Sequence, residues 1–168
     1  MAVVLFFIIS AGILVLQGSL FPLLWPLAFQ PDPLLVLVIS ASILLGEKRG
    51  SLLGLGAGLL QDILFGPALG LFALSKAAAA YLAGLAAREI YKDQMVGPFF
   101  LTFILTFIHE FILFFLINLF FYVSASWENF STPLLLKTLG NVAFLFLIYP
   151  PVYNAGKKGI VFPRDIRL

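Results

Sequence analysis

The chain has 168 residues, of which 62% are hydrophobic and only 11% are charged, and it contains no cysteine. A mean hydropathy of +1.10 lies far outside the range of ordinary soluble domains, so the sequence indicates an integral membrane protein. Disulfides, thiolate metal sites and cysteine nucleophiles are excluded, and a net charge of +2 gives no indication of nucleic-acid binding. The length predicts one all-α membrane domain over residues 1–168, with a short basic tail at about 155–168.

The first third of the chain predicts two spans separated by a proline-rich stretch. Residues 1–21 are long enough to cross a bilayer, for which about 20 residues are needed, and no basic region precedes them as in a signal peptide. Residues 22–33 predict a loop or a bent re-entrant segment, in which Trp25 suits the headgroup interface. Asp32 is expected to cap a second span at 34–45, which is short unless the preceding prolines lie within the membrane.

A charged turn at 47–49 leads into the stretch that is most informative, a predicted membrane hairpin. Its two arms, 51–65 and 69–87, flank a break at Gly66 and Pro67. Small residues recur along both arms, which favours close helix packing, because helix association in lipid depends on backbone approach. The predicted packing and turn residues are Gly50, Gly54, Gly58, Gly66, Pro67, Gly70, Ala80 and Gly84.

Asp62 and Lys76 are ionisable residues inside the otherwise apolar arms of this hairpin. Charged groups at membrane depth are costly, so they normally face protein or water and find partners. If the arms run antiparallel, the long Lys76 side chain can reach Asp62. Glu110, on a later span, is the second candidate partner for Lys76.

The last third predicts a polar loop at 88–96, a fifth span at 99–123, an interfacial loop at 124–133 and a sixth span at 134–153, whose last turn two prolines perturb. Polar residues within these spans are candidates for a proton or polar-ligand site, or for a hydrogen-bonded clasp between helices, and the clasp is the favoured reading. They are Thr102, Thr106, His109, Glu110, Asn118 and Asn141. Helical phase places Asn118 away from His109.

The distribution of lysine and arginine predicts the orientation. Eight of the ten lie in the turns at 46–50 and 88–96 and in the tail, whereas the loops at 22–33, 66–68 and 124–133 hold none. The positive-inside rule then places both termini in the cytoplasm, which requires an even number of spans, and six satisfy it. The tail is expected to act as a topological anchor with some attraction to anionic lipid.

The run from Gly54 to Leu71, together with Pro31-Asp32-Pro33 and the turn Glu47–Gly50, resembles the bacterial rod shape-determining family MreD. The resemblance implies a non-enzymatic, multi-pass subunit of the cell-elongation machinery in the bacterial cell membrane. It implies MreC as the partner and, through MreC, the actin-like MreB and the peptidoglycan synthases. The sequence itself leaves self-association open.

A second hypothesis comes from topology, because the family is similar to the substrate-binding S components of energy-coupling-factor transporters. A transporter subunit needs a polar pocket for a small molecule, whereas a scaffold needs apolar grooves for another helix. The scarcity of polar residues favours the scaffold. No catalytic residue, cofactor site or metal site is predicted, since there is one histidine and no nucleotide-binding or nucleophile motif.

Overall fold

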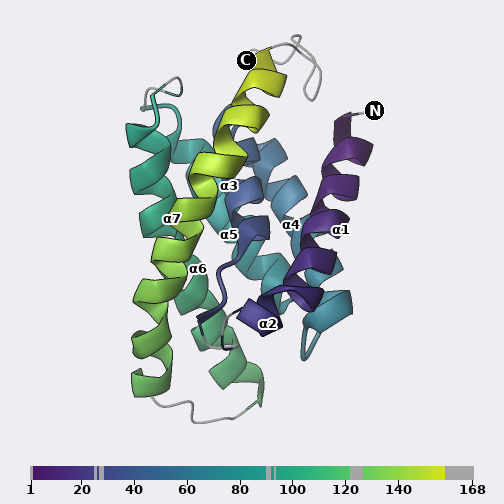
Figure 1. Ribbon diagram of the computed structural model, residues 1–168, viewed down its shortest axis with the longest axis vertical. Coiled ribbons are helices and arrows are strands. Elements are labelled where there is room, and N and C mark those ends of the chain that lie inside the picture. Colours follow the sequence, from purple (N-terminus) through teal and green to yellow (C-terminus); the bar gives the residue numbers. More distant parts are fainter. Residues whose placement is uncertain are drawn as a thin grey trace.

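The computed structural model describes residues 2–24, 26, 29–89, 92, 94–121 and 127–157, so Trp25 and the basic tail beyond Lys157 lie outside the described residues. Within these ranges the regular structure is helical, which confirms the predicted all-α class. The helices are α1 (Ala2–Ser19), α2 (Phe21–Leu24), α3 (Pro33–Leu45), α4 (Glu47–Phe65), α5 (Leu71–Ala86), α6 (Val96–Phe121) and α7 (Trp127–Lys157). Figure 1 shows them as a bundle, with the start of α1 and the end of α7 toward the same end.

In the part of the chain that the structure describes, three helical stretches are long and apolar enough to cross a membrane: Val3–Leu24, Val96–Phe120 and Ser131–Lys157. Helices α3 and α5 are apolar but shorter. Large apolar side chains cover the outside of the bundle, as expected where the surrounding medium is hydrocarbon. The protein is therefore a helical membrane protein.

Helix α3 lies at the centre of the bundle. Every residue from Pro33 to Ile43 is buried, and α3 contacts α1, α4, α5, α6 and α7. Its sequence is hydrophobic on all sides, which is typical of a helix that is surrounded by protein. The hydroxyls of Ser40 and Ser42 donate to the carbonyls of Val36 and Val38 one turn earlier, so these two polar groups are satisfied within the helix.

The central helix is too short to cross the bilayer. Its 13 residues extend about 20 Å, against a hydrocarbon thickness of about 30 Å. Pro31 and Asp32, which precede it, are buried, and Figure 1 shows the chain just before α3 running into the bundle. The burial of Pro31 and Asp32 favours the re-entrant alternative, which stays a prediction.

The predicted hairpin is formed by α4 and α5, with the break at Gly66 and Pro67 confirmed. The glycines on the facing sides leave room for the opposing backbone. A Cβ added at Gly54 would lie 2.8 Å from the Lys76 carbonyl oxygen, and one at Gly58 would lie 2.5 Å from that of Phe72. Gly84 lies equally close to the backbone at Glu47, so glycine allows contact along the full length of the hairpin.

Several predicted boundaries were wrong. Residues 47–49 form the first turn of α4 rather than a separate turn, and residues 127–132 belong to α7 rather than to an interfacial loop. Helix α7 also continues through Pro150 and Pro151 to Lys157. Proline is tolerated inside membrane helices because neighbouring groups and local adjustments satisfy the freed carbonyls, so the rule for soluble helices ended this one too early.

Candidate functional site

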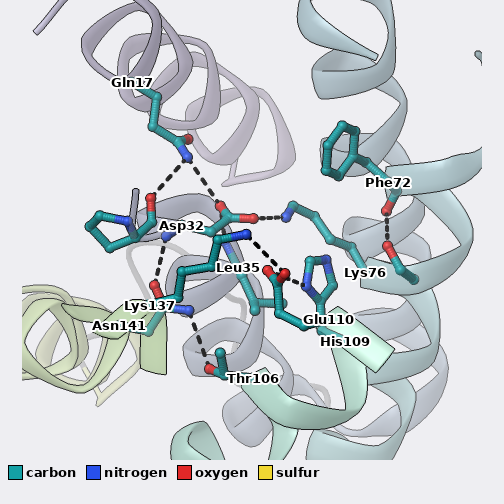
Figure 2. A network of polar contacts seen from close by, with 12 residues as sticks. Gln17, Asp32, Leu35, Phe72, Lys76, Thr106, His109, Glu110, Lys137 and Asn141 are labelled. Atoms are coloured by element: carbon teal, nitrogen blue, oxygen red, sulfur yellow. Dashed lines mark hydrogen bonds and ion pairs between the residues drawn. The ribbon is translucent and has the colours of Figure 1, made fainter. Parts of the chain in front are cut away.

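Polar side chains from five parts of the bundle converge at one place beside the start of α3 (Figure 2). In a chain with so few charged residues this concentration makes the cluster the candidate site. We call it the polar network. Its members are Gln17 on α1, Asp32 before α3, Lys76 on α5, Thr106, His109 and Glu110 on α6, and Lys137 and Asn141 on α7.

Asp32 is the centre of the polar network. One carboxylate oxygen pairs with the ammonium of Lys76, whose side chain is fully buried. The other accepts from the Leu35 backbone N–H at 3.0 Å, so Asp32 is also the N-cap of α3. Its own N–H donates to the side-chain oxygen of Asn141 at 2.6 Å. One residue thus joins the start of α3 to α5 and to α7.

The predicted pairing of Lys76 with Asp62 or Glu110 was wrong. Asp62 is buried at the end of α4 and accepts three backbone N–H groups, from Gly70 at 2.9 Å, Phe72 at 2.8 Å and Ala73 at 3.0 Å. These donors lie at the N-terminus of α5, where the first backbone N–H groups have no partner within the helix. Asp62 therefore caps α5 from the neighbouring helix, and it needs no lysine.

Asn141 and Gln17 extend the polar network across the bundle. The Asn141 amide donates to the Thr106 hydroxyl at 3.2 Å, and Thr106 donates in turn to the Thr102 carbonyl at 2.8 Å. The Gln17 amide lies 3.5 Å from Asp32 Oδ1 and 3.4 Å from the Pro31 carbonyl oxygen, which brings α1 to the same place. By contrast, Asn118 donates to the Phe114 carbonyl within α6, away from this cluster.

A second ion pair joins α6 to α7. Lys137 Nζ lies 3.0 Å from Glu110 Oε2, and His109 Nδ1 lies 3.7 Å from Glu110 Oε1. His109 is fully buried, and within the described part of the chain neither ring nitrogen makes a hydrogen bond. Thr102 is likewise buried, and no described residue partners its hydroxyl oxygen, so α6 presents polar groups to the interior that the described residues do not fully satisfy.

The contacts of the polar network suit a role in fixing how the helices are positioned against one another. Its two cations and two carboxylates are paired with each other, Lys76 with Asp32 and Lys137 with Glu110. Buried ion pairs contribute little net stability, but losing one partner is costly, so they select one arrangement of helices over others. Among the residues that the structure describes, no three histidine or acidic side chains gather as metal ligands would.

The helix ends near the N and C labels of Figure 1 carry separate contacts. Arg88 pairs with Glu47, which joins the two ends of the hairpin. A hydrogen bond from its own backbone N–H and the nearby Arg88 hold the pKa of Glu47 below its usual range. The Tyr149 hydroxyl donates to the Lys92 carbonyl at 2.5 Å and ties α7 to the segment before α6.

Sequence reasoning placed Asp32 only as a cap and missed the roles of Lys137 and Gln17. The available signal was the short second span. A helix this short can begin inside the bilayer, and its N-cap residue then lies at the same depth as an intramembrane lysine. The pairing itself joins residues 44 positions apart and has no local signature.

Comparison with known families gives one match. The family described as rod shape-determining protein MreD matches residues 1–158 of the chain. No curated protein and no solved structure matches it.

Proposed function

Because the chain belongs to the MreD family of rod shape-determining proteins, we propose that it is a non-enzymatic membrane scaffold of the bacterial cell-elongation complex. The family supports a role in rod shape determination and is not a known enzyme family. The proposed direct partner is MreC, and MreB and the peptidoglycan synthases are reached through it. In this role the protein positions wall synthesis.

The observation that carries the proposal is the family match over residues 1–158, and the distribution of side chains supports it. The charged groups of the polar network are turned inward and paired, whereas the outside is apolar, as at Val15 on α1, Phe115 on α6 and Leu147 on α7. In lipid such surfaces associate by packing and by a few interhelical hydrogen bonds. A membrane partner is therefore expected to contribute a transmembrane helix.

The test is depletion in a rod-shaped host, combined with co-purification in mild detergent. We expect depleted cells to become round, and we expect MreC to remain bound to the purified protein through its membrane segment. MreC cut down to its soluble part is the matched control and should not be retained. Cells that stay rod-shaped, or retention of the soluble part alone, would contradict the scaffold proposal.

A small-molecule-binding subunit of a transporter is the second candidate. The polar network favours it, since its eight polar side chains converge beside the start of α3. If growth of the depleted strain depends on an external vitamin, and the purified protein binds that molecule, the transporter subunit replaces the scaffold as the better proposal. Rounded cells without such a requirement favour the scaffold.

We also propose six membrane passages with both termini cytoplasmic. The asymmetry of lysine and arginine supports this orientation, and Figure 1 shows the start of α1 and the end of α7 toward the same end of the bundle. A reporter that is active only outside the cytoplasm should be inactive after Lys157 and active when inserted at residues 66–68. Activity after Lys157, or labelling of residues 88–96 from outside, would contradict the orientation.

A further inference from the structure

His109 is the single histidine of the chain, and its ring on α6 is fully buried. A neutral imidazole has one N–H donor and one acceptor, whichever nitrogen holds the proton. Within the described part of the chain neither nitrogen makes a hydrogen bond. A buried polar group without a partner is costly, and a leucine or phenylalanine would fill the same space without that cost. Packing alone therefore does not account for a histidine at this position.

The carboxylate of Glu110 faces two bases, one with each oxygen. Its Oε2 lies 3.0 Å from Lys137 Nζ, and its Oε1 lies 3.7 Å from His109 Nδ1. The first distance is that of a hydrogen-bonded ion pair, whereas the second is slightly too long for a hydrogen bond. Shortening the second contact by about 1 Å gives a charge-assisted hydrogen bond, which requires a proton on Nδ1.

The charged groups around His109 balance one another without a further proton. His109 interacts electrostatically with Lys76 on α5 and Asp32 before α3, and also with Glu110 on its own helix. Lys76 is paired with Asp32. Lys137, on α7, is paired with Glu110. A proton on His109 therefore adds one positive charge to two matched ion pairs, and Glu110 is the carboxylate that the ring nitrogen approaches.

We propose that His109 and Glu110 form a proton-binding site, in which the bound proton competes with Lys137 for the Glu110 carboxylate. The proton is taken from water and forms an N–H bond on the imidazole, and the resulting imidazolium donates from Nδ1 to Oε1. It enters past Glu110 and Lys137, whose side chains are 13% and 24% exposed, because that of His109 is 1% exposed. This inference is independent of the scaffold function proposed above.

Competition for Glu110 makes one contact between α6 and α7 depend on the proton. The Lys137–Glu110 pair lies one turn along both helices from the hydrogen bond between Asn141 and Thr106. Coupling between two binding events is reciprocal, so if Lys137 opposes proton binding, proton binding weakens the pairing of Lys137. Proton uptake then leaves α6 and α7 joined at this level through Asn141 and Thr106.

The single histidine makes the test direct. The full-length protein, labelled with ¹⁵N-histidine and purified into liposomes without a histidine tag, gives one set of ring-nitrogen NMR signals, which distinguish imidazole from imidazolium. We expect the imidazolium signal to appear between about pH 8 and pH 5 while the helices remain folded. Lys137→Met removes the competitor and should raise the ratio of imidazolium to imidazole about tenfold at a given pH. Lys48→Met, at an exposed position of α4, is the matched control and should leave the ratio unchanged.

The double variant E110Q/K137M removes the carboxylate together with its cation, so it leaves no unpaired charge and tests the site if Lys137→Met does not fold. Its ratio of imidazolium to imidazole should fall about tenfold below that of the unaltered protein. A folded protein whose histidine stays neutral down to about pH 5 would overturn the proton-binding site. A ratio that E110Q/K137M leaves unchanged would overturn the role of Glu110, and a ratio that Lys137→Met leaves unchanged or lowers would overturn the competition.

Discussion

Replacing Lys76 with methionine is expected to lower the free energy of unfolding by about 3–5 kcal/mol, the usual cost of removing one partner from a buried ion pair. Lys76 is fully buried, and its ammonium is paired with Asp32. Methionine is of similar length, so the change removes the charge and leaves the space nearly filled. The Asp32 carboxylate would then remain without a cation inside the bundle.

The double variant D32N/K76M is expected to recover most of this loss. Asparagine still accepts from the Leu35 N–H as an N-cap, and no lone charge remains. The measurement is reversible unfolding in detergent or nanodiscs, with Lys48→Met at an exposed position of α4 as the control for loss of a lysine. A Lys76→Met protein as stable as the control, or a double variant no better than the single one, would contradict the proposed role of the pair.

The helices were predictable from the sequence because hydrophobic length is the strongest signal in a membrane protein. The apolar stretches at residues 34–45, 51–65 and 69–87 correspond to α3, α4 and α5 within a few residues. Ends were less predictable at residues 47–49 and 127–132, where polar residues suggested turns. In the structure both segments continue a helix, since charged residues at a helix end can lie beyond the hydrocarbon layer.

The candidate site was predictable in its composition but not in its pairing. Lys76, Glu110 and Asn141 were identified from their polar character within apolar spans, and all three belong to the polar network. Which of these residues pair with each other depends on the depth in the bundle at which each helix begins. Asp32 was assigned only as the cap of a short span, and the structure also pairs it with Lys76. Asp62 was predicted to pair with a lysine. The sequence pattern does not reveal that it accepts hydrogen bonds from three backbone N–H groups of the chain entering and beginning α5.

Replacing Gly58 with alanine is expected to destabilise the hairpin by about 3 kcal/mol, the upper part of the usual range for overpacking. The added Cβ would lie 2.5 Å from the Phe72 carbonyl oxygen and 2.6 Å from the Ala73 nitrogen. Both atoms belong to the backbone of α5, so no side chain can rotate away and the two helices must separate.

That separation has a second cost, which distinguishes Gly58 from an ordinary tight contact. The carboxylate of Asp62, one turn further along α4, accepts from the N–H groups of Phe72 and Ala73, and moving α5 outward stretches these bonds. Gly12→Ala on α1 is the matched control, because nothing lies within 4 Å of a Cβ there and alanine favours the helix. Unfolding of the two variants should show a large loss for Gly58→Ala and little change or a small gain for Gly12→Ala. Equal stabilities would mean that α4 and α5 have room to move apart, and that close backbone contact does not hold the hairpin.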